Sequence, residues 1–460
     1  MRSRSLRLAG AVLLTAALGA SAAAQSAAPK TSDPTIPFER YNLDNGLEVI
    51  LHQDNTVPLV AVDVWYHVGS GDERPGKSGF AHLFEHMLFQ DSVHVGEDKF
   101  FETLKSVGSS QVNGSTNSDR TNYFEVVPSH QVETALWLES DRMGYFLPTL
   151  TEASFKGQQE VVRNERRQNY DNRPYGRARF ALHKMLYPEG HPYRYMTIGR
   201  HEDLEAASVD DVRQFYKTWY TPANATLVIA GDFETPAMKE LVQKWFGSFP
   251  KSKRPVHRTV PMPEVAHQRQ TVKDPFAKLR LLQYAWHTPA FFAAGDAELD
   301  IVSGVLLSGT GRLHRRLVIE EQLAVNVGGG QQSMGHSSIF QIAVVLKTGA
   351  DMARAEAIID EELQRIAKEP VTKREFDRVV AQTESGFVWG LQGLLSRAET
   401  LHRYNHYVGN PDYIKNDLDR LRTSSPAKVR DVAAKYLRKD RRVEILTVPD
   451  EGAKAEKGTK

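Results

Sequence analysis

The sequence predicts an α+β protein made of two homologous domains, each a mostly antiparallel sheet with helices on one face. Two observations lead to this expectation. Strand-like and helical segments are intermixed in the first half, without the regular alternation of a doubly wound parallel sheet. The second half then repeats the order of the first at a nearly constant offset, which is typical of a duplicated domain.

The N-terminal segment, residues 1–24, is typical of a secretory signal peptide. Basic residues precede a short apolar run over residues 8–20, and the small residues at 22–24 suit a cleavage site. The run is too short to span a bilayer comfortably, and an uncleaved anchor is the alternative. A chain without cysteine cannot carry the lipid of a bacterial lipoprotein. We therefore expect an exported, periplasmic bacterial protein with no membrane anchor.

The first domain is expected over residues 35–248. Its strand candidates alternate apolar and polar residues or are rich in β-branched and aromatic residues. These candidates are residues 47–52, 60–65, 122–127 and 226–230. Helical segments between them complete the α+β pattern.

The second domain is expected over residues 266–449. Thr151 and Thr372 each begin a helical segment as N-cap, with a Phe four residues on, and they lie 221 residues apart. Ser208 and Ser425, 217 residues apart, begin another pair of helices that lead to β-rich runs. Chance matching of short helix starts is the alternative, but two similar offsets in the same order favour duplication.

Two further segments break the periodic patterns. The Pro- and Lys-rich stretch 249–265 is expected to link the domains, and the charged residues 450–460 are expected to form a flexible tail. Three consecutive glycines at 328–330 are expected to form a turn between a strand and a helix, and a flexible loop is the alternative.

The composition excludes several classes of function. With 58 basic and 57 acidic side chains, the formal net charge of +1 gives no electrostatic footprint for nucleic acid or an anionic membrane. The absence of cysteine excludes disulfides, thiolate zinc sites, iron–sulfur clusters and cysteine nucleophiles. Any metal must therefore be held by His, Asp and Glu.

The segment from Gly79 to Phe89 contains the pattern His82-Leu-Phe-Glu85-His86. Histidines at i and i+4 of a helix are about 40° apart around its axis, so both imidazoles can face one ion. Glu85 lies on the same face and can reach a water bound to that ion. A zinc ion lowers the pKa of its bound water towards about 7. The alternative is a pair of helix-surface histidines beside a solvated Glu.

A third metal ligand should be a carboxylate from elsewhere in the fold. Glu160 and Glu165 are the candidates, on a helical stretch. They are five residues apart and face different directions, so only one is expected to coordinate. Spacing within this sequence leaves both open.

Several motifs together resemble the pitrilysin/insulinase family of inverted-motif zinc peptidases. They are residues 79–86, 111–116, 119–124, 161–165, 190–193, 220–224 and 229–233. The resemblance implies one Zn²⁺ per chain, held by His82, His86 and Glu165, with Glu85 as the general base. It implies a metalloendopeptidase that cleaves peptides or unfolded segments by attack of a metal-bound water. The alternative is a non-catalytic peptide-binding subunit of a heteromeric peptidase.

The resemblance also implies a substrate-binding edge strand. In the family, a peptide adds to the sheet edge that corresponds to residues 111–116, so main-chain hydrogen bonds provide affinity. Asn113, Gly114 and Ser115 are the expected substrate-binding residues, and Asn113 resembles the residue that holds the substrate backbone. An Asn-Gly turn is the alternative explanation for this composition.

The sequence departs from the family pattern at the first and the second domain. Gln158 stands where members often have an additional acidic residue. Val318 and Val325 occupy the positions of an Arg and Tyr pair that helps to bind substrate. The positions that correspond to the metal motif in the second repeat are Ser303, Leu306 and Leu307.

These departures lead to a prediction about assembly. Short members of the family form half of a clamshell and close it by pairing with a second subunit. We therefore expect a heterodimer with a family member of similar length that supplies the Arg and Tyr pair. A homodimer is the alternative, because symmetric pairs are the commonest oligomers.

Overall fold

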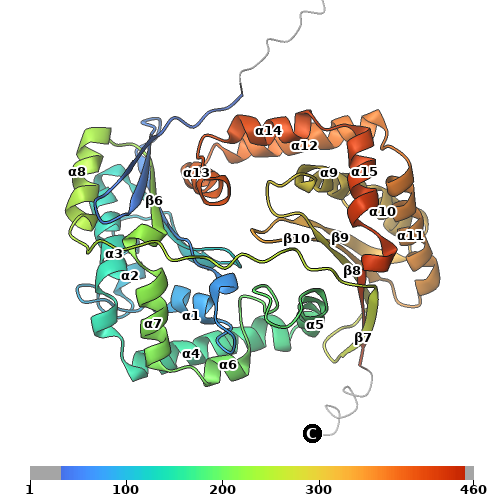
Figure 1. Cartoon of the computed structure of the whole chain (residues 1–460), viewed down its shortest axis with the longest axis horizontal. Helices are drawn as coiled ribbons and strands as arrows, with labels where there is room; N and C mark the ends of the chain where they lie inside the picture. Colours follow the sequence, from blue (N-terminus) through green and yellow to red (C-terminus); the bar gives the residue numbers. More distant parts are fainter. Residues whose placement is uncertain (1–32, 451–460) are drawn as a thin grey trace, which may run out of the picture. The chain divides into compact units, whose positions relative to one another are not determined.

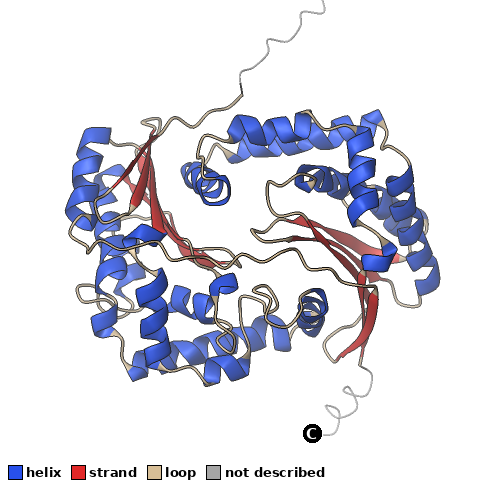
Figure 2. Ribbon diagram, in the orientation of Figure 1, coloured by secondary structure: helices blue, strands red, loops and turns tan. Residues whose placement is uncertain are grey.

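Two β-sheets organise the described part of the chain, residues 33–450, in the computed structural model (Figures 1 and 2). The predicted signal peptide and nearly all of the predicted tail lie outside the described residues. Within residues 33–450, the helices are all too short or too polar to cross a membrane.

The first sheet has six strands in the order β1-β2-β6-β3-β5-β4. The pair β2 and β6 is parallel and the other pairs are antiparallel. The strands are β1 (Glu39–Asn42), β2 (Glu48–Gln53), β3 (Leu59–Tyr66), β4 (Gln111–Thr116), β5 (Thr121–Pro128) and β6 (Ala225–Gly231). Strand β4 is an edge strand, because it pairs only with β5.

The second sheet has five strands in the order β7-β11-β8-β10-β9, again with one parallel pair, β7 and β11. The strands are β7 (Gln268–Asp274), β8 (Leu281–Thr288), β9 (Ala324–Gln332), β10 (Ser338–Leu346) and β11 (Val443–Pro449). Without β1, the first sheet has the same order and the same parallel pair. The predicted α+β class with two homologous, mostly antiparallel domains is therefore confirmed.

Helices fill the connections in both halves. In the first half they are α1 (Phe80–Met87), α2 (Lys99–Ser106), α3 (Val132–Tyr145), α4 (Glu152–Arg166), α5 (Gly176–Leu186), α6 (His201–Glu205), α7 (Val209–Trp219) and α8 (Thr235–Phe246). In the second half they are α9 (Asp296–Leu306), α10 (Arg312–His314), α11 (Met352–Lys368), α12 (Lys373–Gly390), α13 (Leu394–Val408), α14 (Ile414–Arg422) and α15 (Pro426–Tyr436). The expected caps are present, since Thr151 and Thr372 accept hydrogen bonds from backbone N–H groups three residues on.

Alternation along each strand creates two buried faces. Val60, Val62 and Val64 of β3 belong to the large core that the first half's own helices form with the sheet. Ala61, which points to the opposite face, packs instead with Leu394 of α13. The sheet is therefore covered on both sides, and the second cover comes from the other half of the chain.

The two halves exchange one helix each. Helix α13 packs on the first sheet, where Leu401 shares an apolar cluster with Ile50 and Val228. Helix α5 packs on the second sheet, where Leu182 shares a cluster with Val443. Figure 1 shows α13 beside the first sheet and α5 beside the second. The other helices of the first half belong to the core on the opposite face of their own sheet, and most helices of the second half do the same. Part of α14 instead joins the cluster beneath α13 on the first sheet. The prediction of helices on one face of each sheet did not include this second cover.

The three consecutive glycines contradict the expectation of a loop or turn. They lie inside strand β9, paired with residues of β10 from Gln341 to Ala343. Gly329 and Gly330 have φ values of 116° and 136°, which disfavour other residues. A Cβ on Gly329 would lie 2.1 Å from the carbonyl oxygen of Gln341, so the glycine permits a close approach of the two backbones.

The connection between the sheets has no regular structure over residues 250–267. It runs along the molecule as the yellow-green segment between α8 and β7 in Figure 1. Several contacts fix it to the first half. His257 Nδ1 lies 2.9 Å from Asp72 Oδ1, and the Ser252 hydroxyl accepts a hydrogen bond from the Ala223 N–H at 3.0 Å.

Candidate metal centre

Helix α1 carries the His-x-x-Glu-His pattern and is anchored by its apolar face. Phe80, Leu83 and Phe84 are buried in the core of the first half, so the polar positions face outward from that core. The helix begins after Gly79, whose φ of 94° is left-handed. The Glu73 carboxylate accepts hydrogen bonds from the N–H groups of Gly79 and Ala81, at 3.0 and 2.9 Å, and so caps the helix start.

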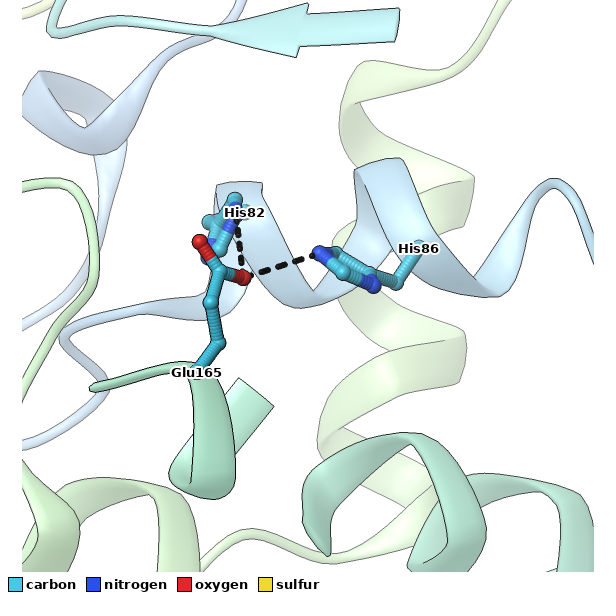
Figure 3. A group of neighbouring side chains, drawn as sticks. All are labelled: His82, His86 and Glu165. Carbon is cyan, nitrogen blue, oxygen red and sulfur yellow. Dashed lines mark ion pairs between the residues drawn. The ribbon is translucent and has the colours of Figure 1, made fainter. Parts of the chain in front are cut away.

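The structure brings His82, His86 and Glu165 together (Figure 3). The Nε2 atoms of His82 and His86 lie 3.5 and 3.3 Å from Oε2 of Glu165. One ligand atom from each of the three residues lies within 4.8 Å of the others. Glu165 comes from the C-terminal turn of α4, which packs beside α1 and continues into the π-helical segment η4 (Arg167–Asp171).

Glu160 lies outside this cluster. Its side chain is exposed and forms ion pairs with Arg163 and Arg167. The geometry thus separates the two carboxylates that the sequence spacing left open. Gln158, which stands where the family often has an acidic residue, lies seven residues before Glu165 on the same helix.

The electrostatics of the three residues suit a divalent cation. Burial lowers the pKa of His82 to about 4, so its imidazole is neutral near pH 7 and offers a lone pair. A hydrogen bond with His86 lowers the pKa of Glu165, which is therefore ionised. Two imidazoles and one carboxylate that converge on one point form a donor set that zinc accepts, with room for a fourth ligand.

Glu85 lies beside the cluster and outside the set of converging ligand atoms. Burial raises the pKa of its carboxyl group, whereas a hydrogen bond from Thr116 acts in the opposite direction. The Thr116 hydroxyl on strand β4 donates to Glu85 Oε2 at 2.7 Å. The carboxylate that the motif places next to the metal ligands is therefore oriented by the edge strand.

The predicted substrate-binding residues lie on this edge strand. Asn113 is exposed, and its Oδ1 accepts a hydrogen bond from the Gly114 N–H at 2.9 Å. Gly114 is buried against Glu85 and Phe89. Ser115 donates to Asn122 Oδ1 at 2.7 Å, so its hydroxyl is engaged within the sheet. Asn113 is thus the member of this group whose side chain is exposed.

The second half carries different residues at the corresponding places. Ser303 lies in α9, where its hydroxyl donates to the Leu299 carbonyl, and Leu306 and Leu307 are buried. Val318 is partly buried against the second core, and Val325 is exposed at the start of β9. Among the described residues, the only cluster of three or more potential ligands is that of His82, His86 and Glu165.

Two residues that contact the site were not assigned a role from the sequence. Glu73 caps α1 from nine residues before His82, and Thr116 reaches Glu85 from another element. Thr116 belonged to a recognised motif, which is a signal that this position is constrained. No periodic pattern identifies Glu73, because its partners are backbone groups.

Comparison with known proteins supplies the context for this geometry. Residues 48–194 match the family described as "Insulinase (Peptidase family M16)". Residues 206–383 match the family described as "Peptidase M16 inactive domain". The first match contains the two histidines, Glu85 and Glu165, and the second contains most of the half without metal ligands.

Individual relatives cover nearly the whole chain. The chain is 29% identical over 440 residues to "Zinc protease PqqE" of Helicobacter pylori, covering 93% of this chain and 95% of the relative. It is 23% identical to "Mitochondrial-processing peptidase subunit beta" of Lentinula edodes, covering 87% of this chain and 88% of the relative. The crystal structure of a protease from Helicobacter pylori superposes with a TM-score of 0.84 at 25% identity, covering 90% of this chain and 99% of that one.

Proposed function

Because the chain belongs to the insulinase family of peptidases, family M16, we propose that it is a zinc-dependent endopeptidase acting on peptides or unfolded segments. The observation that carries the proposal is the convergence of His82, His86 and Glu165 beside Glu85. The sequence before residue 25 supports export to the periplasm as part of the same proposal.

The three converging residues are the proposed ligands of one zinc ion. When bound, zinc supplies a Lewis acid that polarises a carbonyl oxygen and lowers the pKa of water. Histidine binds a metal ion as the neutral imidazole, so two histidines and the ionised Glu165 would give the ligand set one negative charge, which partly neutralises the dication.

Glu85 is the proposed general base. Its carboxylate takes a proton from the attacking water and passes it to the leaving amine, so one group serves both halves of the reaction. Burial raises the pKa of its carboxyl group towards neutral pH. A general base whose pKa lies closer to the working pH holds the proton long enough to donate it to the leaving amine. The hydrogen bond from Thr116 fixes which carboxylate oxygen is available.

Substrate binding is proposed at the free edge of β4. An extended peptide can add there as a further strand, since β4 pairs with β5 on its other side only. Asn113 is exposed on this strand and is the proposed side-chain contact to the substrate backbone. Gly114 and Ser115 contribute through their backbone, because Gly114 has no side chain and the Ser115 hydroxyl is engaged with Asn122.

The division of the chain follows from this assignment. Residues 35–248 are the proposed catalytic domain, 249–265 the linker and 266–449 a homologous domain without metal ligands. We further propose a partner of similar length that supplies the Arg and Tyr absent at Val318 and Val325. A relative that is named as a subunit, the fungal processing-peptidase subunit beta, supports a multi-subunit arrangement.

Replacing Glu85 with Gln tests the catalytic proposal. The variant should retain about one zinc per chain, because the ligand set is unchanged. Its peptide cleavage should fall by at least roughly 10²-fold, the usual contribution of a general base. Glu160→Gln is the matched control, since this carboxylate on α4 lies outside the cluster. Cleavage by Glu85→Gln at the rate of the control would show that the mechanism is wrong.

A non-catalytic peptide-binding subunit is the competing function. The description of the second matched family as an inactive domain favours it only for residues 206–383, which do not include the three proposed metal ligands. Metal analysis of the purified chain separates the two functions, because a catalytic site requires about one zinc per chain. Absence of zinc in protein purified without chelators would favour the binding subunit.

A further inference from the structure

The turn between β4 and β5, residues 117–120, is tied to the second half of the chain through Asp119. The Tyr407 hydroxyl of α13 donates to Asp119 Oδ2 at 2.9 Å. The N–H of Gly335, in the turn between β9 and β10, donates to the same oxygen at 2.9 Å. The hydroxyl of Tyr193, which follows α5, donates to the other oxygen, Oδ1.

The surroundings of Asp119 are built for this contact. A Cβ on Gly335 would lie 3.1 Å from Asp119 Oδ1, so a glycine there permits the close approach. The Tyr193 hydroxyl also accepts the N–H of His336 at 3.1 Å, which adds a second link to the same turn. Hydrogen bonds to a carboxylate are stronger than those between neutral groups, so the three donors hold Asp119 firmly.

A short path connects this carboxylate to the proposed base. Asn117 Oδ1 accepts the N–H groups of Asp119 and Arg120, at 2.8 and 2.9 Å, which stiffens the turn. Arg120 Nη1 donates to the Ser115 carbonyl at 2.8 Å and joins the turn to β4. The next residue of β4, Thr116, donates to Glu85.

We propose that Asp119 is a positioning residue through which the second domain holds β4, and with it Thr116, against Glu85. This inference rests on the proposed function of the site. The second domain supplies no metal ligand, but two of the three donors to Asp119 come from it. The second domain therefore takes part in catalysis by positioning residues of the first. A peptide added to β4 would therefore bind to a strand that the second domain has already fixed.

The position of Tyr407 depends on more than its own hydroxyl. The His402 ring of the same helix stacks on Trp65 at 5.0 Å between centroids. His406 Nδ1 lies 2.7 Å from His67 Nδ1. Removing the Tyr407 hydroxyl should therefore take one of the three donors from Asp119, and so weaken its link to the second half, while α13 stays on the first sheet.

Tyr407→Phe tests the proposal, with Tyr404→Phe as the matched control. Tyr404 lies on the same helix and also donates to a carboxylate, at 2.8 Å, but that carboxylate is Asp417 of the second half. For Tyr407→Phe we expect kcat for peptide cleavage to fall roughly tenfold, with KM changed by less than about twofold. Zinc content should be unchanged, and amide hydrogen exchange over residues 111–120 should be faster. The control should match the wild type in all four measurements.

Two outcomes would overturn the inference. One is wild-type kcat and wild-type exchange of residues 111–120 in Tyr407→Phe. The other is an equal change in Tyr404→Phe, which would indicate a general loosening of α13. Hydrogen exchange is measured with and without added zinc, so it reports on the link to Asp119 independently of peptidase activity. Failure of the proposed function would instead appear as full activity of Glu85→Gln.

Discussion

The residues around Gly114 leave too little space for a side chain at this position. A Cβ at this position would lie 3.1 Å from Cγ of Glu85, 3.0 Å from Phe89 and 3.2 Å from the Asn122 carbonyl oxygen. Its φ is not among the left-handed values, so the constraint is space and not backbone conformation. The edge strand can approach α1 closely only because this residue is glycine.

Gly114→Ala should therefore displace the Glu85 side chain or the edge strand. We expect kcat to fall by about 10–100-fold, because a small misplacement of a reacting group is costly, while zinc stays bound. Steady-state kinetics and metal analysis check this. Gly157→Ala is the control, since a Cβ on this α4 residue meets nothing within 4 Å. If both variants have wild-type kcat, the close packing at Gly114 is irrelevant to catalysis.

Single residues differ in how far the sequence could predict them. His82, Glu85 and His86 follow from helical spacing, because i and i+4 fix their relative direction. Glu165 could be chosen over Glu160 only through the family resemblance, since their directions depend on where α4 lies. Thr116 acts on Glu85 through a tertiary contact that spans 31 residues, which local periodicity does not encode.

At the level of elements, α13 brings buried histidines onto the first sheet. His402 and His406 each have a pKa lowered to about 3, chiefly by burial. His402 Nε2 bonds the Asp63 carbonyl oxygen at 2.9 Å. The charged or titratable groups around the pair include the Asp63 carboxyl group, His67, Arg120, Arg254 and His257. Both imidazoles are therefore neutral in the folded protein.

This arrangement predicts a loss of stability in acid. The unfolded histidines titrate near 6.5, so below that pH the unfolded chain binds protons that the folded chain excludes down to about 3. The free energy of unfolding should fall by about 1.4 kcal/mol per pH unit for each histidine across this window. Urea unfolding at several pH values measures how steeply the free energy of unfolding depends on pH. His406→Asn should reduce this slope by about 1.4 kcal/mol per pH unit, the contribution of one histidine. An unchanged slope in that variant would contradict the assignment.

The elements also show where sequence patterns stop being informative. The starts of α4, α7, α12 and α15 were predicted from the residues that begin them, and β2 and β3 from alternation. Strands β5, β6 and β11 were predicted as runs rich in β-forming residues. An apolar stripe on a helix shows that one face is buried but not which sheet buries it, so the exchange of α5 and α13 was not predicted. The glycines of β9 were predicted as a loop or turn, because glycine usually marks one and rarely a close strand pair.

For the whole molecule, the main open prediction is a second subunit. The described residues contain one cluster of potential metal ligands, and Val318 and Val325 replace the expected Arg and Tyr. We expect the protein purified from its source to have about twice the mass of one chain and to contain a second chain of similar length. Light scattering and mass spectrometry check this. A stable, active homodimer would contradict the heterodimer.

At this scale the duplication could be predicted and the purpose of the second copy could not. The offsets of 217 and 221 residues indicated two copies, which the matching strand orders confirm. The loss of the metal motif at Ser303, Leu306 and Leu307 was also visible in the sequence. The contacts of Tyr407 and Gly335 with Asp119 depend on how the copies meet, which a repeat alone does not specify.

The exchange of α5 and α13 also determines when folding can finish. The bond between His402 and Asp63 joins residues 339 positions apart, so the N-terminal sheet receives its second cover only after nearly the whole chain has been made. Until then, Ile50, Val228 and Ala230 present an uncovered apolar face, which is a surface prone to aggregation. When this chain emerges from a ribosome or an export channel with its N-terminus first, the first half therefore cannot complete its fold until residues 394–408 have emerged. Until then its apolar face must be protected from aggregation.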